Sequence, residues 1–265
     1  MANPRPRQGK SAEQQVTGPA PSVTAKALAL LGTFDPEHTC QSLSDMARGA
    51  ALPIATAHRL AGELVAWGAL DRADANYVVG HRIWQLGRLA PVQQNVAEMA
   101  APYMQDVLFV TQNVVNLFIL DGDRALLLER ISGTRSGSPF RRIGARMSLH
   151  GSAAGKVMLA FGPEDLLERI SGQLQPETTR TITDPRRLGA EVAEVRTRGY
   201  ATTSEESGPD NFGLAVPVLL PNGALAAVLG VVAQGGPPPV GTVVPVLRIA
   251  ARSIARRFYS GGVGY

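Results

Sequence analysis

The stretch LSDMARGAALPIATAHRLAGELVAWG, residues Leu43 to Gly68, decides the fold of the N-terminal part of the chain. It predicts two short helices around a tight turn, with Pro53 in the first turn of the second helix. After Pro53 one apolar stripe recurs at spacings of three and four: Ala57, Leu60, Ala61, Leu64 and Val65. The outward face is then Ile54, Ala55, His58, Arg59, Gly62 and Glu63. This pattern favours a helix-turn-helix, whose second helix enters the DNA major groove, over an ordinary helical hairpin only once its flanks are considered.

Those flanks complete a small domain. Val23 to Leu31 predicts an apolar helix that closes a three-helix core. Ala69 to Arg72 and Tyr77 to Val79 are extended runs separated by Asp, Ala and Asn, which predicts a hairpin. A hairpin directly after a recognition helix is the wing of a winged helix. The candidate DNA contacts are Ser44, Thr56, His58, Arg59, Arg72 and Asn76.

The chain here resembles the IclR family of bacterial transcriptional regulators. The winged helix is the first matching block, and the stretch from Gly80 to Pro102, which resembles the family's linker helix, is the second. The junction from His150 to Lys156 is the third, and the segments 199–201, 205–206 and 215–218 form the fourth. The expected division is a disordered tail at 1–21, a DNA-binding winged helix-turn-helix at 22–80, a linker helix region at 81–104 and an effector-binding and oligomerisation domain at 105–265.

Two features of the DNA-binding part depart from the family pattern. Ala51 stands where the family usually has Gly, and a left-handed backbone there would cost on the order of 1 kcal/mol. The opening of the second helix, Pro53 to Thr56, lacks two polar groups that the family often has. Residues 22–80 also carry four basic against six acidic side chains, although the whole chain has a net charge of +4. Non-specific DNA affinity should therefore be weak, and specific binding should need a dimer or tetramer.

Composition sets further bounds. At 265 residues and 45% hydrophobic content, the chain can bury a sizeable core and form two domains. The single cysteine, Cys40, excludes an internal disulfide and a cysteine-cluster metal site, and it is expected in a loop. The N-terminal tail has no apolar centre, and prolines interrupt the apolar run 215–233, so neither a signal peptide nor a membrane span is expected. We therefore expect a cytoplasmic protein without a membrane partner.

From Asn113 onward the sequence predicts an antiparallel sheet with helices packed on it. Expected strands are 114–120, 125–131, 140–143, 214–219 and 225–232, and expected helices are 153–161, 164–173, 185–198 and 243–258, with a Gly/Ser loop at 132–139. The overall class is α/β (α+β) with two domains. The resemblance implies a profilin-like or GAF-like second domain whose pocket binds a small effector.

The pocket is expected near the junction from His150 to Lys156. Ser152 precedes a helix whose free N–H groups favour an anionic group, although a plain N-cap explains Ser152 equally simply. Together with positions carried over from the family, the effector-binding candidates are Asn116, His150, Gly151, Ser152, Ala153, Asp210, Asn211, Gly213, Leu214, Gly230 and Val232. Asn116 either faces the pocket or is satisfied within the sheet. Because Gly213, Gly230 and Val232 replace polar family residues and the glycines enlarge the space, we expect a larger, apolar effector such as an aromatic acid.

Enzyme functions find no support. The segment 150–157 lacks the first Gly and the Ser/Thr of a phosphate-binding loop, and Gly151-Ser152 lacks the spacing of a nucleophile elbow. The four histidines have no metal-ligand spacing, so neither a metal nor a cofactor is expected. Glu205 and Glu206 are expected to point to opposite faces of a strand, on a solvated surface.

The sequence therefore predicts a ligand-responsive regulator that binds a palindromic double-stranded operator as a homodimer or homotetramer. A repressor is favoured over an activator, because blocking a promoter needs only occupancy. Pro91 is expected to break or kink the linker helix, which makes it a candidate hinge. Two alternatives stay open: a regulator without a functional effector pocket, and a small-molecule-binding GAF-like protein whose N-terminal module only dimerises.

Overall fold

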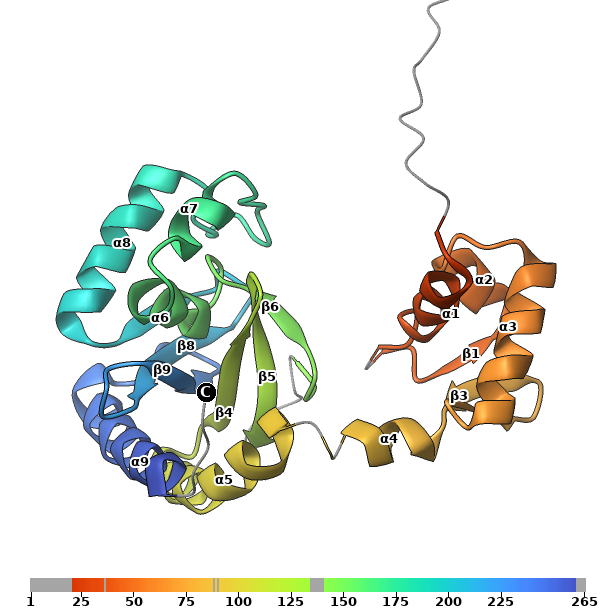
Figure 1. Ribbon diagram of the computed structural model, residues 1–265. Coiled ribbons are helices and arrows are strands. Elements are labelled where there is room, and N and C mark those ends of the chain that lie inside the picture. Colours follow the sequence, from red (N-terminus) through yellow and green to blue (C-terminus); the bar gives the residue numbers. More distant parts are fainter. Residues whose placement is uncertain (1–20, 36, 88, 90, 134–140, 261–265) are drawn as a thin grey trace, which may run out of the picture. The chain divides into compact units, whose positions relative to one another are not determined.

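The computed structural model describes residues 21–35, 37–87, 89, 91–133 and 141–260, and it contains two compact units, Met1–Ile83 and Trp84–Tyr265 (Figure 1). Nearly all of the expected tail at 1–21 and most of the expected loop at 132–139 lie outside the described residues. No helix in the described part of the chain is both long and apolar enough to cross a membrane.

The first unit is a three-helix core with a small antiparallel sheet, as the sequence predicts. Its elements are α1 (Val23–Leu31), β1 (Cys40–Ser42), α2 (Leu43–Gly49), α3 (Ile54–Trp67), β2 (Leu70–Ala73) and β3 (Asn76–Val79). The Ser22 and Ser42 hydroxyls cap α1 and α2 by accepting the N–H groups of Ala25 and Asp45. Leu30, Met46 and Leu60 are almost fully buried where the three helices meet.

The expected hairpin is formed by β2 and β3, but its sheet contains a third strand that was not expected. Cys40 does not lie in a loop but begins β1, which pairs with β3 so that Cys40 stands opposite Val78. The strand order is β1-β3-β2. A three-residue strand is too short to show an alternating pattern, so the sequence alone did not reveal it.

The expected linker helix is two helices, α4 (His81–Gly87) and α5 (Pro91–Thr111). Pro91 stands at a break between these two helices, which is one of the two outcomes expected for it. It is the first residue of α5, where a proline fits because the first N–H groups of a helix have no intrahelical acceptor. α5 belongs to the second unit, and its residues Val96, Ala100 and Met104 are buried in that unit's core.

A six-stranded antiparallel sheet forms the middle layer of the second unit (Figure 1). Its strands are β4 (Val114–Asp121), β5 (Arg124–Ile131), β6 (Arg146–Ser148), β7 (Ala201–Ser204), β8 (Phe212–Leu219) and β9 (Leu225–Ala233), in the order β6-β5-β4-β9-β8-β7. One face is covered by α5 and α9 (Val240–Ser260), and the other by α6 (Ala153–Phe161), α7 (Leu166–Ser171) and α8 (Pro185–Arg198). The expected fold class is confirmed.

One strand prediction is wrong. Residues 141–143, the described part of the expected third strand, form no strand; the third strand is β6, which begins six residues after the expected start. Gly144 has φ +89, which turns the backbone, and its N–H donates to the Leu127 carbonyl at 2.8 Å. The chain therefore joins the edge of β5 only after this turn.

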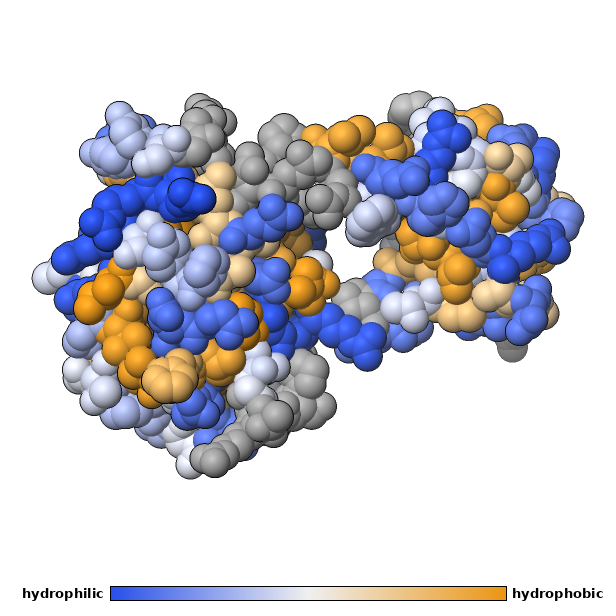
Figure 2. Space-filling view, turned by 90° about the horizontal axis from the view of Figure 1, so that it is seen from below, coloured by the Kyte–Doolittle hydropathy of each residue, from blue (hydrophilic) through white to orange (hydrophobic). Residues whose placement is uncertain are grey.

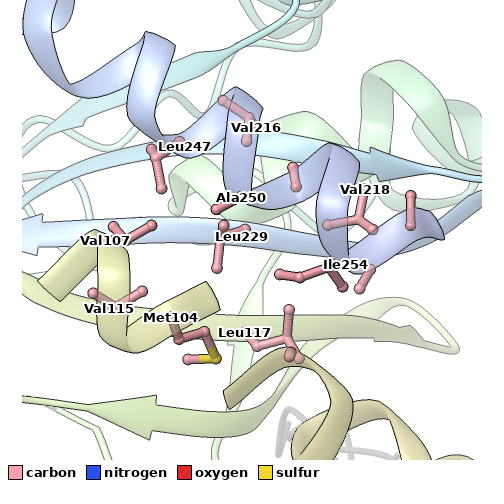
Figure 3. Close-up of a cluster of buried hydrophobic side chains, with 14 of the residues drawn as sticks. Met104, Val107, Val115, Leu117, Val216, Val218, Leu229, Leu247, Ala250 and Ile254 are labelled. Carbon is pink, nitrogen blue, oxygen red and sulfur yellow. The ribbon is translucent and has the colours of Figure 1, made fainter. Parts of the chain in front are cut away.

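The helices α5 and α9 have two different faces. Figure 2 shows the second unit from the side of α5 and α9, where apolar groups lie among hydrophilic ones. The exposed apolar side chains of these two helices include Phe109, Val110 and Ile249. The inner faces of α5 and α9 pack on the sheet (Figure 3). The contacts involve Met104 and Val107 of α5, Leu247, Ala250 and Ile254 of α9, and Val115, Leu117, Val216, Val218 and Leu229 of the strands. This core fixes the positions of β4, β8 and β9, which carry much of the site described next.

Candidate functional site

The outward face of α3 is the candidate DNA-reading surface. All six residues expected to face outward are exposed, while Ala57, Leu60 and Ala61 are buried. The turn before α3 contains Ala51 at φ +52, which is the left-handed backbone expected at this position. The helix ends at Gly68, whose left-handed conformation stops α3 before the wing.

The predicted DNA contacts lie on four elements of this unit, α2, α3, β2 and β3. Ser44 is exposed on α2, His58 and Arg59 are exposed on α3, and Thr56 is half-buried in the first turn of α3. In the wing, Arg72 is exposed on β2 and Asn76 is half-buried on β3. The Arg72 guanidinium carbon lies 5.5 Å from the centroid of the Tyr77 ring.

Ion pairs engage the basic side chains on the two helices of the turn. The Arg59 guanidinium lies 2.5 Å from the Glu63 carboxylate, one turn along α3, and the Arg48 guanidinium lies 3.0 Å from Asp45 on α2. Both pairs are exposed, so water screens them and a phosphate can replace the carboxylate at little cost. Because residues 22–80 carry more acidic than basic side chains, the expectation of a weak sequence-independent attraction to DNA is unchanged.

A cavity of about 140 Å³ opens in the second unit beside β4, β8, β9 and the N-terminus of α6. Eight predicted effector-binding residues line it: Asn116, Ser152, Ala153, Asn211, Gly213, Leu214, Gly230 and Val232. Its wall also includes apolar side chains that sequence reasoning did not single out, among them Phe118, Leu127 and Met147.

Three predicted residues do not line this cavity. The His150 ring is buried, and its Nε2 lies 2.8 Å from the Gln175 carbonyl oxygen. Gly151 is buried, and its N–H donates to the Ser148 hydroxyl at 3.2 Å. Asp210 has φ +53, and its carboxylate accepts the Gly235 N–H at 2.6 Å. These residues hold the loops behind the cavity.

Gly213 and Gly230 line the cavity, as expected, and the packing of the sheet also requires glycine at both positions. A Cβ on Gly213 would stand 2.5 Å from the Thr203 hydroxyl oxygen, and a Cβ on Gly230 would stand 2.9 Å from the Leu214 carbonyl oxygen. Both glycines therefore permit close packing between neighbouring strands.

The N-terminus of α6 presents backbone donors at the cavity. The Ser152 hydroxyl accepts the Gly155 N–H at 3.1 Å and donates to the Ser148 carbonyl at 2.8 Å, so it is a capping group. Ala153 and Ala154, which line the cavity, occupy the first turn, where a helix leaves its N–H groups without intrahelical acceptors.

The polar lining also includes two cations, Arg130 and Arg141, and the buried amide of Asn116. Arg130 on β5 stands opposite Asn116 on β4, and Arg141 lies at the same cavity. Burial lowers the pKa of the Arg130 guanidinium, which nevertheless stays charged. Asn116 is 3% exposed, and its amide oxygen has no hydrogen-bond partner among the described residues. The arrangement suits an organic anion that also offers a hydrogen-bond donor.

The expectation that Glu205 and Glu206 lie on a solvated surface is wrong for Glu206. β7 ends at Ser204, so Glu205 and Glu206 do not alternate along a strand. Glu206 is buried, and its Oε1 lies 2.8 Å from Nζ of the buried Lys156. Among the described residues, no three His, Cys, Asp or Glu side chains are grouped so as to hold a metal ion.

Two family models match the chain. The model of the IclR helix-turn-helix domain matches residues 23–74, and the model of the bacterial transcriptional regulator IclR C-terminal domain matches residues 90–236. The HTH-type transcriptional regulator BhcR of Paracoccus denitrificans is 30% identical over 194 residues, which cover 72% of this chain and 70% of BhcR. XynR of Escherichia coli, also an HTH-type transcriptional regulator, is 28% identical over 197 residues, covering 73% and 78%.

Solved structures agree with these matches. An IclR homologue from Microbacterium hydrocarbonoxydans, in complex with 4-hydroxybenzoate, is 30% identical and superposes with a TM-score of 0.84, covering 90% of this chain and all of that chain. Thermotoga maritima IclR is 27% identical, with a TM-score of 0.69 and coverage of 91% and 98%. These relatives are transcriptional regulators and not enzymes. Because the family models match both units, the chain belongs to the IclR family of DNA-binding transcriptional regulators.

Proposed function

We propose that this regulator changes its affinity for operator DNA when a small aromatic carboxylate binds in the cavity of the second unit. The observation that carries the proposal is Asn116, a buried amide that lines the cavity and whose oxygen has no hydrogen-bond partner in the described part of the chain. A buried polar atom without a partner costs free energy, so a ligand that supplies a donor is favoured there.

The chemistry of the lining supports an aromatic carboxylate. Arg130, Arg141 and the first turn of α6 favour a negative charge, while Phe118 and Leu127 favour an apolar ring. The related structure from Microbacterium hydrocarbonoxydans contains 4-hydroxybenzoate, a ring with a carboxylate at one end and a hydroxyl donor at the other. The same class of molecule fits the groups around this cavity.

The effector part is tested by measuring the melting temperature of the purified protein with benzoate, 4-hydroxybenzoate and the uncharged 4-hydroxybenzyl alcohol. A ligand that binds only the native state must raise the melting temperature. We expect the carboxylates to do so and the alcohol to have little effect. Arg130→Gln should abolish the shift, whereas Arg124→Gln, an exposed arginine on the same strand, should preserve it. If no carboxylate shifts the wild type, the regulator without a functional pocket is favoured.

On the DNA side, we propose that residues 22–80 read the operator and that residues 105–265 bind the effector and assemble two or four subunits. The exposed Phe109, Val110 and Ile249 on α5 and α9 supply apolar surface for assembly. Repression by occupancy, released by the effector, needs a coupling free energy of about 1–3 kcal/mol between the two sites.

The DNA side is tested by fluorescence anisotropy on the DNA upstream of the protein's own gene and on a scrambled sequence. Arg59→Ala should weaken operator binding by about 1–3 kcal/mol. The matched variant is Glu63→Gln, which frees the Arg59 guanidinium from its ion pair and should leave binding equal or tighter. If Arg59→Ala binds as the wild type does, the module that only dimerises is favoured.

A further inference from the structure

Lys156 is the largest side chain that the described part of the chain buries almost completely. It is 1% exposed and lies on α6, four residues after the capping Ser152. All residues of α6 from Ala153 to Ala160 are buried, so the Lys156 stem has no path to the surface along its own helix. An isolated ammonium group in such a place would cost several kcal/mol, and it therefore requires a charged partner.

That partner comes from a loop that forms part of the cavity wall. Nζ of Lys156 lies 2.8 Å from Oε1 of Glu206, which immediately follows β7. A second carboxylate, Glu191 on α8, stands 3.9 Å from Nζ and is itself held by Arg198 at 3.0 Å. The other Glu206 oxygen, Oε2, is buried without a hydrogen-bond partner among the described residues, so the Glu206 side chain is fixed through Oε1.

Other contacts of the loop 205–211 fix its backbone at one end. The Thr178 hydroxyl donates to the Glu205 carbonyl at 2.7 Å, and the Thr181 hydroxyl donates to the Glu206 carbonyl at 2.6 Å. The Glu205 N–H donates to the Asn211 carbonyl at 2.8 Å and closes the loop. Glu205 and Asp210 both have positive φ, which L-residues keep only when their surroundings hold them.

The loop and α6 both contribute to the cavity. Ser207 and Asn211 line it from the loop, and Ser152, Ala153 and Ala154 line it from α6. Lys156 joins these two walls, because its helix supplies one and its partner Glu206 precedes Ser207 in the other. Neither Lys156 nor Glu206 lines the cavity itself, so the pair acts through the positions of its neighbours.

We propose that the Lys156–Glu206 ion pair positions the loop 205–211 against α6 and thereby sets the affinity of the cavity for its effector. That an effector binds in the cavity rests on the proposed function. That the ion pair positions the loop rests on the contacts described above. The two residues are positioning residues, which act through Ser207, Asn211 and the N-terminus of α6.

The test compares two substitutions that each remove one carboxylate from the surroundings of Lys156. Glu206→Gln removes the charge from the link to the loop and leaves at most a weaker hydrogen bond to a neutral amide, while Glu191 remains 3.9 Å from Nζ and keeps the ammonium compensated. Glu191→Gln removes the carboxylate on α8 and leaves the link intact. With 4-hydroxybenzoate as the probe, titration calorimetry should give at least a tenfold weaker Kd for Glu206→Gln and less than a twofold change for Glu191→Gln. Equal losses in both variants would mean charge compensation alone and would overturn the proposal.

Hydrogen exchange of the full-length protein without ligand supplies the second readout. Amides of the segment 205–211 should exchange faster in Glu206→Gln and at the wild-type rate in Glu191→Gln. Unchanged exchange in Glu206→Gln would overturn the positioning role, whatever the binding data give. If the wild type binds no carboxylate, the proposed function fails, and the exchange experiment alone decides whether the ion pair holds the loop.

Discussion

The recognition helix α3 and the cavity helix α6 differ in how much of their surface the fold covers. α3 buries one stripe and leaves its other face to solvent. α6 is buried from Ala153 to Ala160, because it lies between the sheet and α8 (Figure 1). An amphipathic pattern therefore describes α3 well. In a helix that is buried all round, every polar group must instead find its partner inside the protein.

The ion pairs of the two helices illustrate the difference. Arg59 and Glu63 pair within α3 while more than half of each side chain is exposed. Lys156 and Glu206 pair across the fold with little access to water. An exposed pair within a helix contributes only about 0.3–0.5 kcal/mol, whereas loss of one member of a buried pair removes several kcal/mol. The two helices should consequently respond very differently to similar substitutions.

Removal of the buried charge should have the largest effect. Lys156→Met leaves Glu206 buried without its counter-ion and should lower the free energy of unfolding by about 3–5 kcal/mol. Arg59→Ala, the equivalent deletion on α3, should lower it by less than about 0.5 kcal/mol. Urea denaturation followed by circular dichroism measures both. Equal losses in the two variants would contradict the comparison.

A glycine-to-alanine substitution should have opposite signs in the two helices. A Cβ on Gly155 of α6 would stand 2.3 Å from the backbone of Leu149, so Gly155→Ala should destabilise by about 1–3 kcal/mol. A Cβ on Gly62 of α3 meets no atom within 4 Å, so Gly62→Ala should stabilise by about 0.5–1 kcal/mol. The same denaturation experiment applies, and a stable Gly155→Ala variant would show that α6 can shift away from Leu149.

The turn before α3 offers a smaller change. Ala51 has φ +52, so Ala51→Gly should relieve strain and stabilise by up to about 1 kcal/mol. The neighbouring Ala50 has φ −85, where glycine brings only greater freedom to the unfolded chain. Ala50→Gly should therefore destabilise, by about 0.4–1 kcal/mol. Thermal unfolding of the two variants measures the contrast, and a loss in both would exclude strain at Ala51.

The smallest expected effect concerns pH. Burial raises the pKa of the Glu206 carboxyl above its ordinary value of 4.5, and the Lys156 ammonium only partly offsets this. The native state then holds the proton more tightly than the unfolded state, so stability falls as the pH rises from about 4.5 through the raised pKa. The difference between wild type and Glu206→Gln, measured by urea denaturation at each pH, should show this fall. A difference that grows more favourable with rising pH would contradict it.

Local patterns in the sequence predicted much of the fold. α1 and α8 have the expected bounds, Val23–Leu31 and Pro185–Arg198, because each has a side-chain cap and a clear end. The three-residue strands β1 and β6 were missed or misplaced, since so short a strand is defined by its partner rather than by its own residues.

The site was harder to predict, because distant segments build it. The sequence placed Asn116 mid-strand and left its orientation open, and the structure places it at the cavity opposite Arg130. Neither Arg130 nor Arg141 belongs to a sequence motif. Their positions at the cavity therefore could not be predicted from the sequence. Glu206 was expected in solvent because nothing local indicates that Lys156, fifty residues earlier, lies next to it.

The sheet order has a consequence for how the protein is made. β9, the last strand of the sheet to be synthesised, lies between β4 and β8. The ribosome must therefore complete nearly the whole second unit before β4 gains its inner neighbour, whereas the three helices and the wing of the first unit are finished much earlier. Long-range pairing of this kind is slow, and domains fold in the order in which they emerge. A nascent chain thus acquires its DNA-reading unit first, and one that stops before Leu225 leaves the facing edges of β4 and β8 open to other strands.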